Sequence, residues 1–140
     1  MMGARSKSRK RALDILYAAE IHSESPVVAL DRLIVEDHAP ANPYTEVLVR
    51  GVVEHLPRID GLLSQYSEGW TLDRMPAVDR NVLRMGVFEI LYADDLPAPV
   101  AVSEALRLVS DLSTDDSPQF VNGILGAITR DREVLLSPRD

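Results

Sequence analysis

The stretch PAVDRNVLRMGVFEILYA, residues 76–93, decides the fold because its apolar residues cover nearly the whole circumference of a helix. These apolar residues are Val78, Val82, Leu83, Met85, Val87, Phe88, Ile90 and Leu91. A helix that is apolar all round is buried, so this segment is predicted to be a buried central helix on which the others pack. Arg84 and Glu89 interrupt it and need partners, because an unpaired buried charge is costly. Asp79 and Arg80, near its start, are expected to reach the surface.

Apolar residues at helical spacing predict more helices on both sides of this segment. The predicted helices cover residues 9–21, a segment from residue 26, residues 43–56, a segment around 59–66, residues 100–112 and residues 117–130. A capping residue followed by proline marks three of the starts, at Ser25, Asn42 and Ser117. No clear strand pattern or internal repeat interrupts this series. We therefore predict an all-α fold, a compact bundle of about seven helices with short links.

Length and composition indicate one globular domain over residues 1–140, with a hydrophobic content of 46% that supports a real core. The chain has no cysteine, which excludes disulfides and thiolate metal sites. No apolar run is long enough for a membrane span, and Asp14 and Glu20 interrupt the segment after the basic N-terminus, unlike a signal peptide. A cytoplasmic protein that does not enter the membrane is expected. Residues 131–140 are charged and are expected to form a loose tail.

The net charge of −7 is unevenly distributed. Five of the 15 basic side chains lie in the first 13 residues, so the remaining ten are set against 22 acidic side chains. The five are Arg5, Lys7, Arg9, Lys10 and Arg11. A basic arm on an acidic body indicates contact with a polyanion such as nucleic acid, with residues 1–8 as its flexible part. The alternative is a solvated, frayed terminus.

Patterns that would indicate catalysis or metal binding are missing from the sequence. The three histidines have no metal-ligand spacing, and the paired aspartates lack the surrounding donors of a calcium loop. There is no glycine-rich phosphate loop and no nucleophile elbow. The sequence therefore predicts no enzyme, no metal and no cofactor.

Two aromatic residues stand apart from the predicted core stripes. In the helix that starts at Ser117, Phe120 lies about 80° from the centre of the apolar stripe, and Asp116 falls on the same side. In the first helix, Tyr17 lies on the side of the arm's lysines, where it could stack on a base or only widen the buried face. Trp70, the single tryptophan, is interpreted as a packing anchor.

Several segments, taken in order and spacing, resemble the NusB family of bacterial transcription antitermination factors. They are the basic run into RALDILY (11–17), Ile59-Asp60 with Trp70, VDRNVLR (78–84) leading to FEILY (88–92), Leu96-Pro97 through Val100 and Val102 to Glu104-Ala105, and FVNGIL (120–125). Each segment is weak alone, and together they cover nearly the whole chain.

The resemblance implies a seven-helix fold that binds boxA, a short single-stranded RNA element in ribosomal RNA operon leaders, together with NusE, a small-subunit ribosomal protein. The complex would join RNA polymerase and prevent termination. The resemblance places Arg5, Lys7, Arg9, Lys10 and Arg11 on RNA phosphates, and Tyr17, Asp79, Asp116 and Phe120 at the RNA surface. Phe120 would stack on a base, while the carboxylates accept hydrogen bonds from base amino groups. Asp79 stands where several relatives have glutamate, so its reach is shorter.

Two other functions stay open at this point. The chain could be a protein-only scaffold or a self-associating helical domain whose acidic body carries the interaction. The fold also resembles the N-terminal domain of some RNA cytosine methyltransferases, but no cofactor domain follows in this sequence. The sequence does not decide whether the chain pairs with itself as a homodimer.

Overall fold

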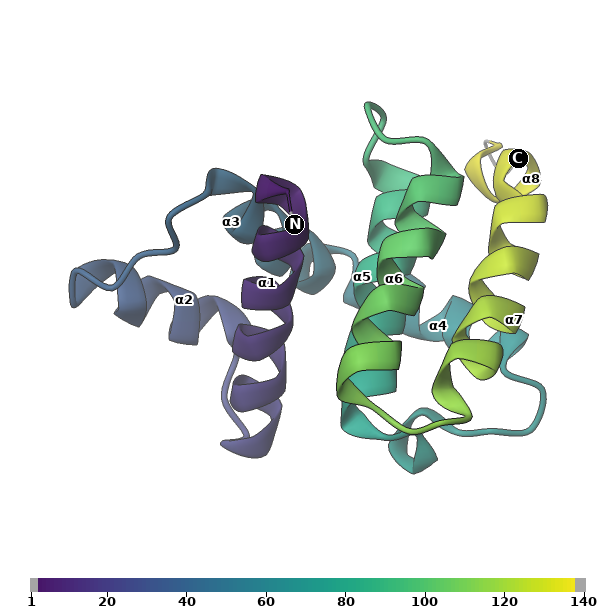
Figure 1. The fold of residues 1–140 in the computed structure, drawn as a ribbon, viewed down its shortest axis with the longest axis horizontal. Coiled ribbons are helices and arrows are strands. Elements are labelled where there is room, and N and C mark those ends of the chain that lie inside the picture. Colours follow the sequence, from purple (N-terminus) through teal and green to yellow (C-terminus); the bar gives the residue numbers. More distant parts are fainter. Residues whose placement is uncertain (1–2, 138–140) are drawn as a thin grey trace. The chain divides into compact units, whose positions relative to one another are not determined.

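The chain is helical throughout residues 3–137, the part that the computed structural model describes, and contains no strand in that range. Contacts group the chain into two compact units, residues 1–56 and 57–140 (Figure 1). The first unit holds α1 (Ala4–Ile21), α2 (Pro26–Val35) and α3 (Pro43–Glu54). From Leu56 onward follow α4 (Leu56–Tyr66), the 3-10 helix η1 (Leu72–Arg74), α5 (Ala77–Tyr92), α6 (Ala98–Leu112), α7 (Ser117–Arg130) and α8 (Arg132–Leu136). The all-α prediction is confirmed, whereas the single domain stays a prediction.

Helix α5 is the buried helix of the second unit, as its apolar circumference predicts. Eleven of its 16 residues are buried, and it packs against α6, α7 and α8. Arg84 has the partner it needs, because its guanidinium donates to both carboxylate oxygens of Asp60, at 2.8 and 3.0 Å. Gly86 lets α7 approach closely, since a Cβ at this position would lie 2.7 Å from Cδ1 of Leu125. The centre of the core is therefore where α5 meets α7.

The first helix begins earlier than predicted, at Ala4 rather than Arg9. The hydroxyl of Ser8 donates to the carbonyl of Ala4 at 2.8 Å, and the hydroxyl of Thr45 on α3 donates to the carbonyl of Ser8 at 3.1 Å. These contacts hold the first turns in place. The predicted flexible arm is thus helical from Ala4 to residue 8, while residues 1–2 lie outside the described part.

The C-terminal tail also has more structure than predicted. Residues 132–136 form α8, which is held by a hydrogen bond of 2.8 Å from Nε of Arg132 to the carbonyl of Ile90. Arg58 on α4 donates to the carbonyl of Leu135. The prediction of a loose tail is wrong for these residues, and residues 138–140 lie outside the described part. No helix within residues 3–137 combines the length and apolarity needed to cross a bilayer.

Candidate nucleic-acid interface

Asp79 fastens the turn between α6 and α7 to the first turn of α5. Ser113, directly after α6, donates to its Oδ1 at 2.6 Å, and Ser117, the first residue of α7, donates to its Oδ2 at 2.8 Å. Only 2% of the surface of Asp79 is exposed. The prediction that Asp79 reaches the surface is wrong, because both carboxylate oxygens are used inside the fold.

Ser117 does not cap α7 as predicted. The residue before the helix is Asp116, whose side chain makes no capping hydrogen bond, and Pro118 is the second helical residue. The Ser117 hydroxyl bonds to Asp79 and accepts from the backbone N–H of Thr114 at 3.2 Å. Asp116 is exposed beside the helix start. Its carboxylate is therefore available to a ligand.

Trp70 and Phe120 form an aromatic pair at the surface of the second unit. Their ring centroids lie 6.3 Å apart with an interplanar angle of 70°. Trp70 is 56% exposed, so its interpretation as a packing anchor is wrong. The hydroxyl of Ser67 donates to the carbonyl of Trp70 at 2.6 Å, and Gly69 adopts a φ of +95°, which glycine tolerates without strain. This turn after α4 presents the indole ring beside α7.

A hollow of about 330 Å³ lies beside the aromatic pair. Its lining comes from the loop after α4, from η1, from the start of α5 and from the start of α7. The lining residues are Trp70, Arg74, Met75, Pro76, Asp79, Thr114, Asp116, Ser117 and Phe120. The structure thus brings together three residues that the resemblance placed at the RNA surface, Asp79, Asp116 and Phe120.

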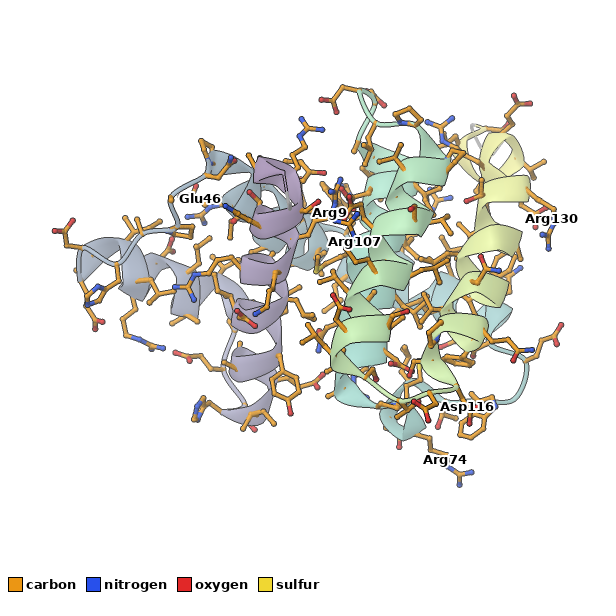
Figure 2. All side chains as sticks on the ribbon, in the orientation of Figure 1. Arg9, Glu46, Arg74, Arg107, Asp116 and Arg130 are labelled. Carbon is orange, nitrogen blue, oxygen red and sulfur yellow. The ribbon has the colours of Figure 1, made fainter. Side chains whose placement is uncertain are left out.

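The hollow combines groups that suit an unpaired nucleotide. An aromatic face can stack on a base, a carboxylate can accept from base amino groups, and an arginine can bind a phosphate. Phe120 and Trp70 supply the rings, Asp116 the exposed carboxylate and Arg74 the cation. Figure 2 shows Arg74 and Asp116 at the same end of the second unit. Trp70 and Arg74 were not identified from the sequence; an isolated tryptophan in a glycine turn was the available signal.

The basic residues of α1 fall into three groups in the first unit. The guanidinium groups of Arg5 and Arg9 lie 4.4 and 5.7 Å from the ring centroid of Tyr44 on α3. Lys10 forms an ion pair of 3.5 Å with Asp14. The side chains of Lys7 and Arg11 are exposed.

Tyr17 is 39% exposed and lies two turns after Lys10 on the same side of α1. It therefore points away from the buried side of its helix, where the sequence alone left two interpretations open. The residues of α1 and those around Phe120 belong to different units. The expectation that the arm lies close to Phe120 stays a prediction.

A second hollow adjoins the aromatic pair and is lined by Trp70, Phe120 and residues of α4 and α7. At its edge the hydroxyl of Tyr66 donates to Oδ2 of Asp131 at 2.5 Å. This hydrogen bond raises the pKa of Tyr66 above its ordinary value of 10.0. In residues 3–137 no group of three or more acidic or histidine side chains could hold a metal ion.

Comparisons with known proteins agree with this arrangement. The model of the NusB family matches residues 6–130. The transcription antitermination protein NusB of Nocardioides sp. is 68% identical over 96% of this chain and 99% of that protein. The protein of the same name from Saccharopolyspora erythraea is 56% identical over 91% of this chain and 87% of that protein.

Solved structures are similar over nearly the whole chain. The NusB structure from T. maritima has a TM-score of 0.83 at 34% identity and covers 94% of each chain. A structure described as antitermination factors NusB and NusE in complex with dsRNA has a TM-score of 0.78 at 27% identity, over 93% of this chain and 98% of that chain.

Proposed function

The chain belongs to the NusB family, and from this membership we propose that it is a transcription antitermination factor that binds RNA together with NusE. The role is that of a binding protein and not of an enzyme. One observation carries the proposal: the hollow beside Phe120 joins two aromatic rings, an exposed carboxylate and an arginine in one unit. An RNA-binding relative solved with NusE supports the choice of partner.

The finer parts of the proposal concern the RNA and the assembly. We expect a single-stranded element of the boxA type in ribosomal RNA leaders, because only an unpaired base can enter the hollow and stack on Phe120. Tyr17 and the basic side chains of α1 would bind the same strand, with RNA polymerase as the recipient of the assembled complex. Such a protein acts where transcripts are made, in the cytoplasm.

Asp79 has a positioning role in this proposal. Both of its oxygens already accept hydrogen bonds from serines at the α6–α7 turn. It lines the hollow and holds in place the turn that carries Asp116. We therefore expect Asp116 to accept the base amino group and Asp79 to fix the shape of the site.

The test is an RNA titration with and without NusE at two salt concentrations. Binding that strengthens with NusE and weakens with salt supports the proposal, since phosphate contacts release counterions. Light scattering on the same samples reports self-association. If no RNA binds with or without NusE while the chain associates with itself, the alternative of a protein-only scaffold is favoured.

A further inference from the structure

The hollow between the first turns of α1 and the loop before α3 has the features of a nucleotide subsite. It measures about 440 Å³, within the usual range of ligand pockets. Its lining residues are Ala4, Lys7, Ser8, Arg11, Ala39, Pro40, Ala41, Asn42 and Thr45. All of them lie in the first unit, apart from the hollow beside Phe120.

Two unengaged cations face this hollow. Lys7 and Arg11 are one helical turn apart and therefore lie on the same face of α1. Within residues 3–137 neither side chain has a hydrogen bond or an ion pair. The other arginines of the arm lie against Tyr44 instead. A phosphate oxygen can thus be bound by Lys7 and Arg11 without breaking an existing contact.

The remaining walls suit the apolar and polar parts of a nucleotide. Ala39, Pro40 and Ala41 form an apolar side beside the cations. Asn42 uses its Oδ1 to accept from the backbone N–H of Tyr44 at 2.8 Å, which leaves its side-chain amide as a donor. Below the hollow, Thr45 donates to the carbonyl of Ser8 and ties α3 to α1. The site is therefore held by a contact that does not involve its binding groups.

We infer that this hollow binds one nucleotide of the RNA, with its phosphate on Lys7 and Arg11 and its sugar or base against residues 39–41. Arg5 and Arg9 then serve to position the helix on Tyr44, so the basic arm is divided between binding and support. The inference rests on the proposed function, because it takes the same RNA strand as the ligand.

The first experiment measures RNA affinity of the complete chain with NusE over a range of salt concentrations. The double variant Lys7→Ala/Arg11→Ala should bind about tenfold more weakly, from loss of charged hydrogen bonds. Its slope of log K against log salt should fall by about 0.7, the value for one phosphate of a single strand. The matched control is Arg32→Ala/Arg107→Ala, which removes the same charge at exposed residues that pair with Glu24 and Glu104. The control should retain the wild-type slope.

A second experiment tests the apolar wall. Ala41→Glu places a carboxylate beside Lys7 and Arg11 and should weaken binding, whereas Val35→Glu, at an 84% exposed position on α2, should not. In NMR spectra, RNA should shift the amide signals of Ala39, Ala41 and Asn42. Unmoved signals at these residues, with an unchanged salt slope in the double variant, would overturn the inference. If wild-type protein binds RNA and only Phe120→Ala weakens it, this subsite is wrong while the proposed function stands; if wild type binds no RNA, the proposed function fails first.

Discussion

Ser117, the first residue of α7, donates a hydrogen bond of 2.8 Å to the buried carboxylate of Asp79 on α5. A hydrogen bond to a buried charge typically contributes about 1.5–3 kcal/mol. The bond joins two helices that both line the hollow beside Phe120. Stability and RNA binding should therefore depend on the same pair.

We predict that Asp79→Ala and Ser117→Ala each lower the free energy of unfolding by about 1–3 kcal/mol and weaken RNA binding. Their effects should be coupled, so that the double variant loses less than the sum of the two. Urea unfolding and RNA titration of the four proteins give both cycles. Additive losses in RNA affinity would show instead that Asp79 acts on RNA independently of Ser117.

The exposed indole of Trp70 should report RNA binding directly. It is the single tryptophan of the chain, so intrinsic fluorescence comes from a residue of the hollow. We expect RNA to change this fluorescence, and we expect Trp70→Ala to weaken binding by about 1–3 kcal/mol if a base stacks on the ring. The melting temperature should change little, because the ring is more than half exposed. Trp70→Phe serves as the control that keeps an aromatic face; equal binding by the Ala and Phe variants would argue against stacking.

Phe120→Ala should reduce RNA affinity by a similar about 1–3 kcal/mol. The ring is half-buried and packs edge-on against Trp70, so a loss of packing must be separated from a loss of stacking. Phe120→Leu keeps most of the apolar volume but offers no aromatic face. A loss of RNA affinity in both variants, with unfolding curves close to wild type for Phe120→Leu, supports a base on the ring.

Much of the fold could be predicted from local pattern. The apolar circumference of residues 76–93 identified the buried helix, and a capping residue followed by proline placed the starts of α2 and α3. The start of α1 was missed because contacts from Tyr44 and Thr45, nearly 40 positions away, stabilise its first turns. Periodicity carries no information on such distant partners.

The candidate site was predictable only in part for the same reason. Helical spacing marked Phe120 and Asp116 as lying off the core stripe. It could not show that Ser113 and Ser117 converge on Asp79, or that the turn at Gly69 brings Trp70 beside Phe120. The division of the basic arm also depends on the position of α3. Each of these features joins residues from different helices.

The ion pair between Arg84 and Asp60 should contribute to stability of the second unit. Both side chains are mostly covered, with exposures of 16% and 26%, and the geometry is bidentate. Asp60→Ala leaves the Arg84 guanidinium without this carboxylate, so we expect a loss of about 1–3 kcal/mol in the free energy of unfolding. Asp73→Ala, at an exposed position in η1, is the control and should change stability by less than about 0.5 kcal/mol. Chemical denaturation measures both, and equal effects would show that the pair adds nothing specific.

Tyr44 should determine whether the start of α1 is ordered. Its ring carries the guanidinium groups of Arg5 and Arg9, and each cation–π contact is worth about 0.5–2 kcal/mol. We predict that Tyr44→Leu, which keeps apolar bulk but removes the π face, speeds amide hydrogen exchange in residues 7–11. Amides of α2 in the same protein should exchange at the wild-type rate and serve as the internal control.

The same variant should weaken RNA binding although Tyr44 does not line the hollow of Lys7 and Arg11. The reason is that frayed turns no longer hold these two side chains on one face, so the entropy of ordering them is lost from the binding free energy. Adding Tyr44→Leu to the Lys7→Ala/Arg11→Ala variant should therefore cause little further loss. A full additional loss of affinity would mean that Arg5 and Arg9 bind RNA themselves, and the support role assigned to them would be wrong.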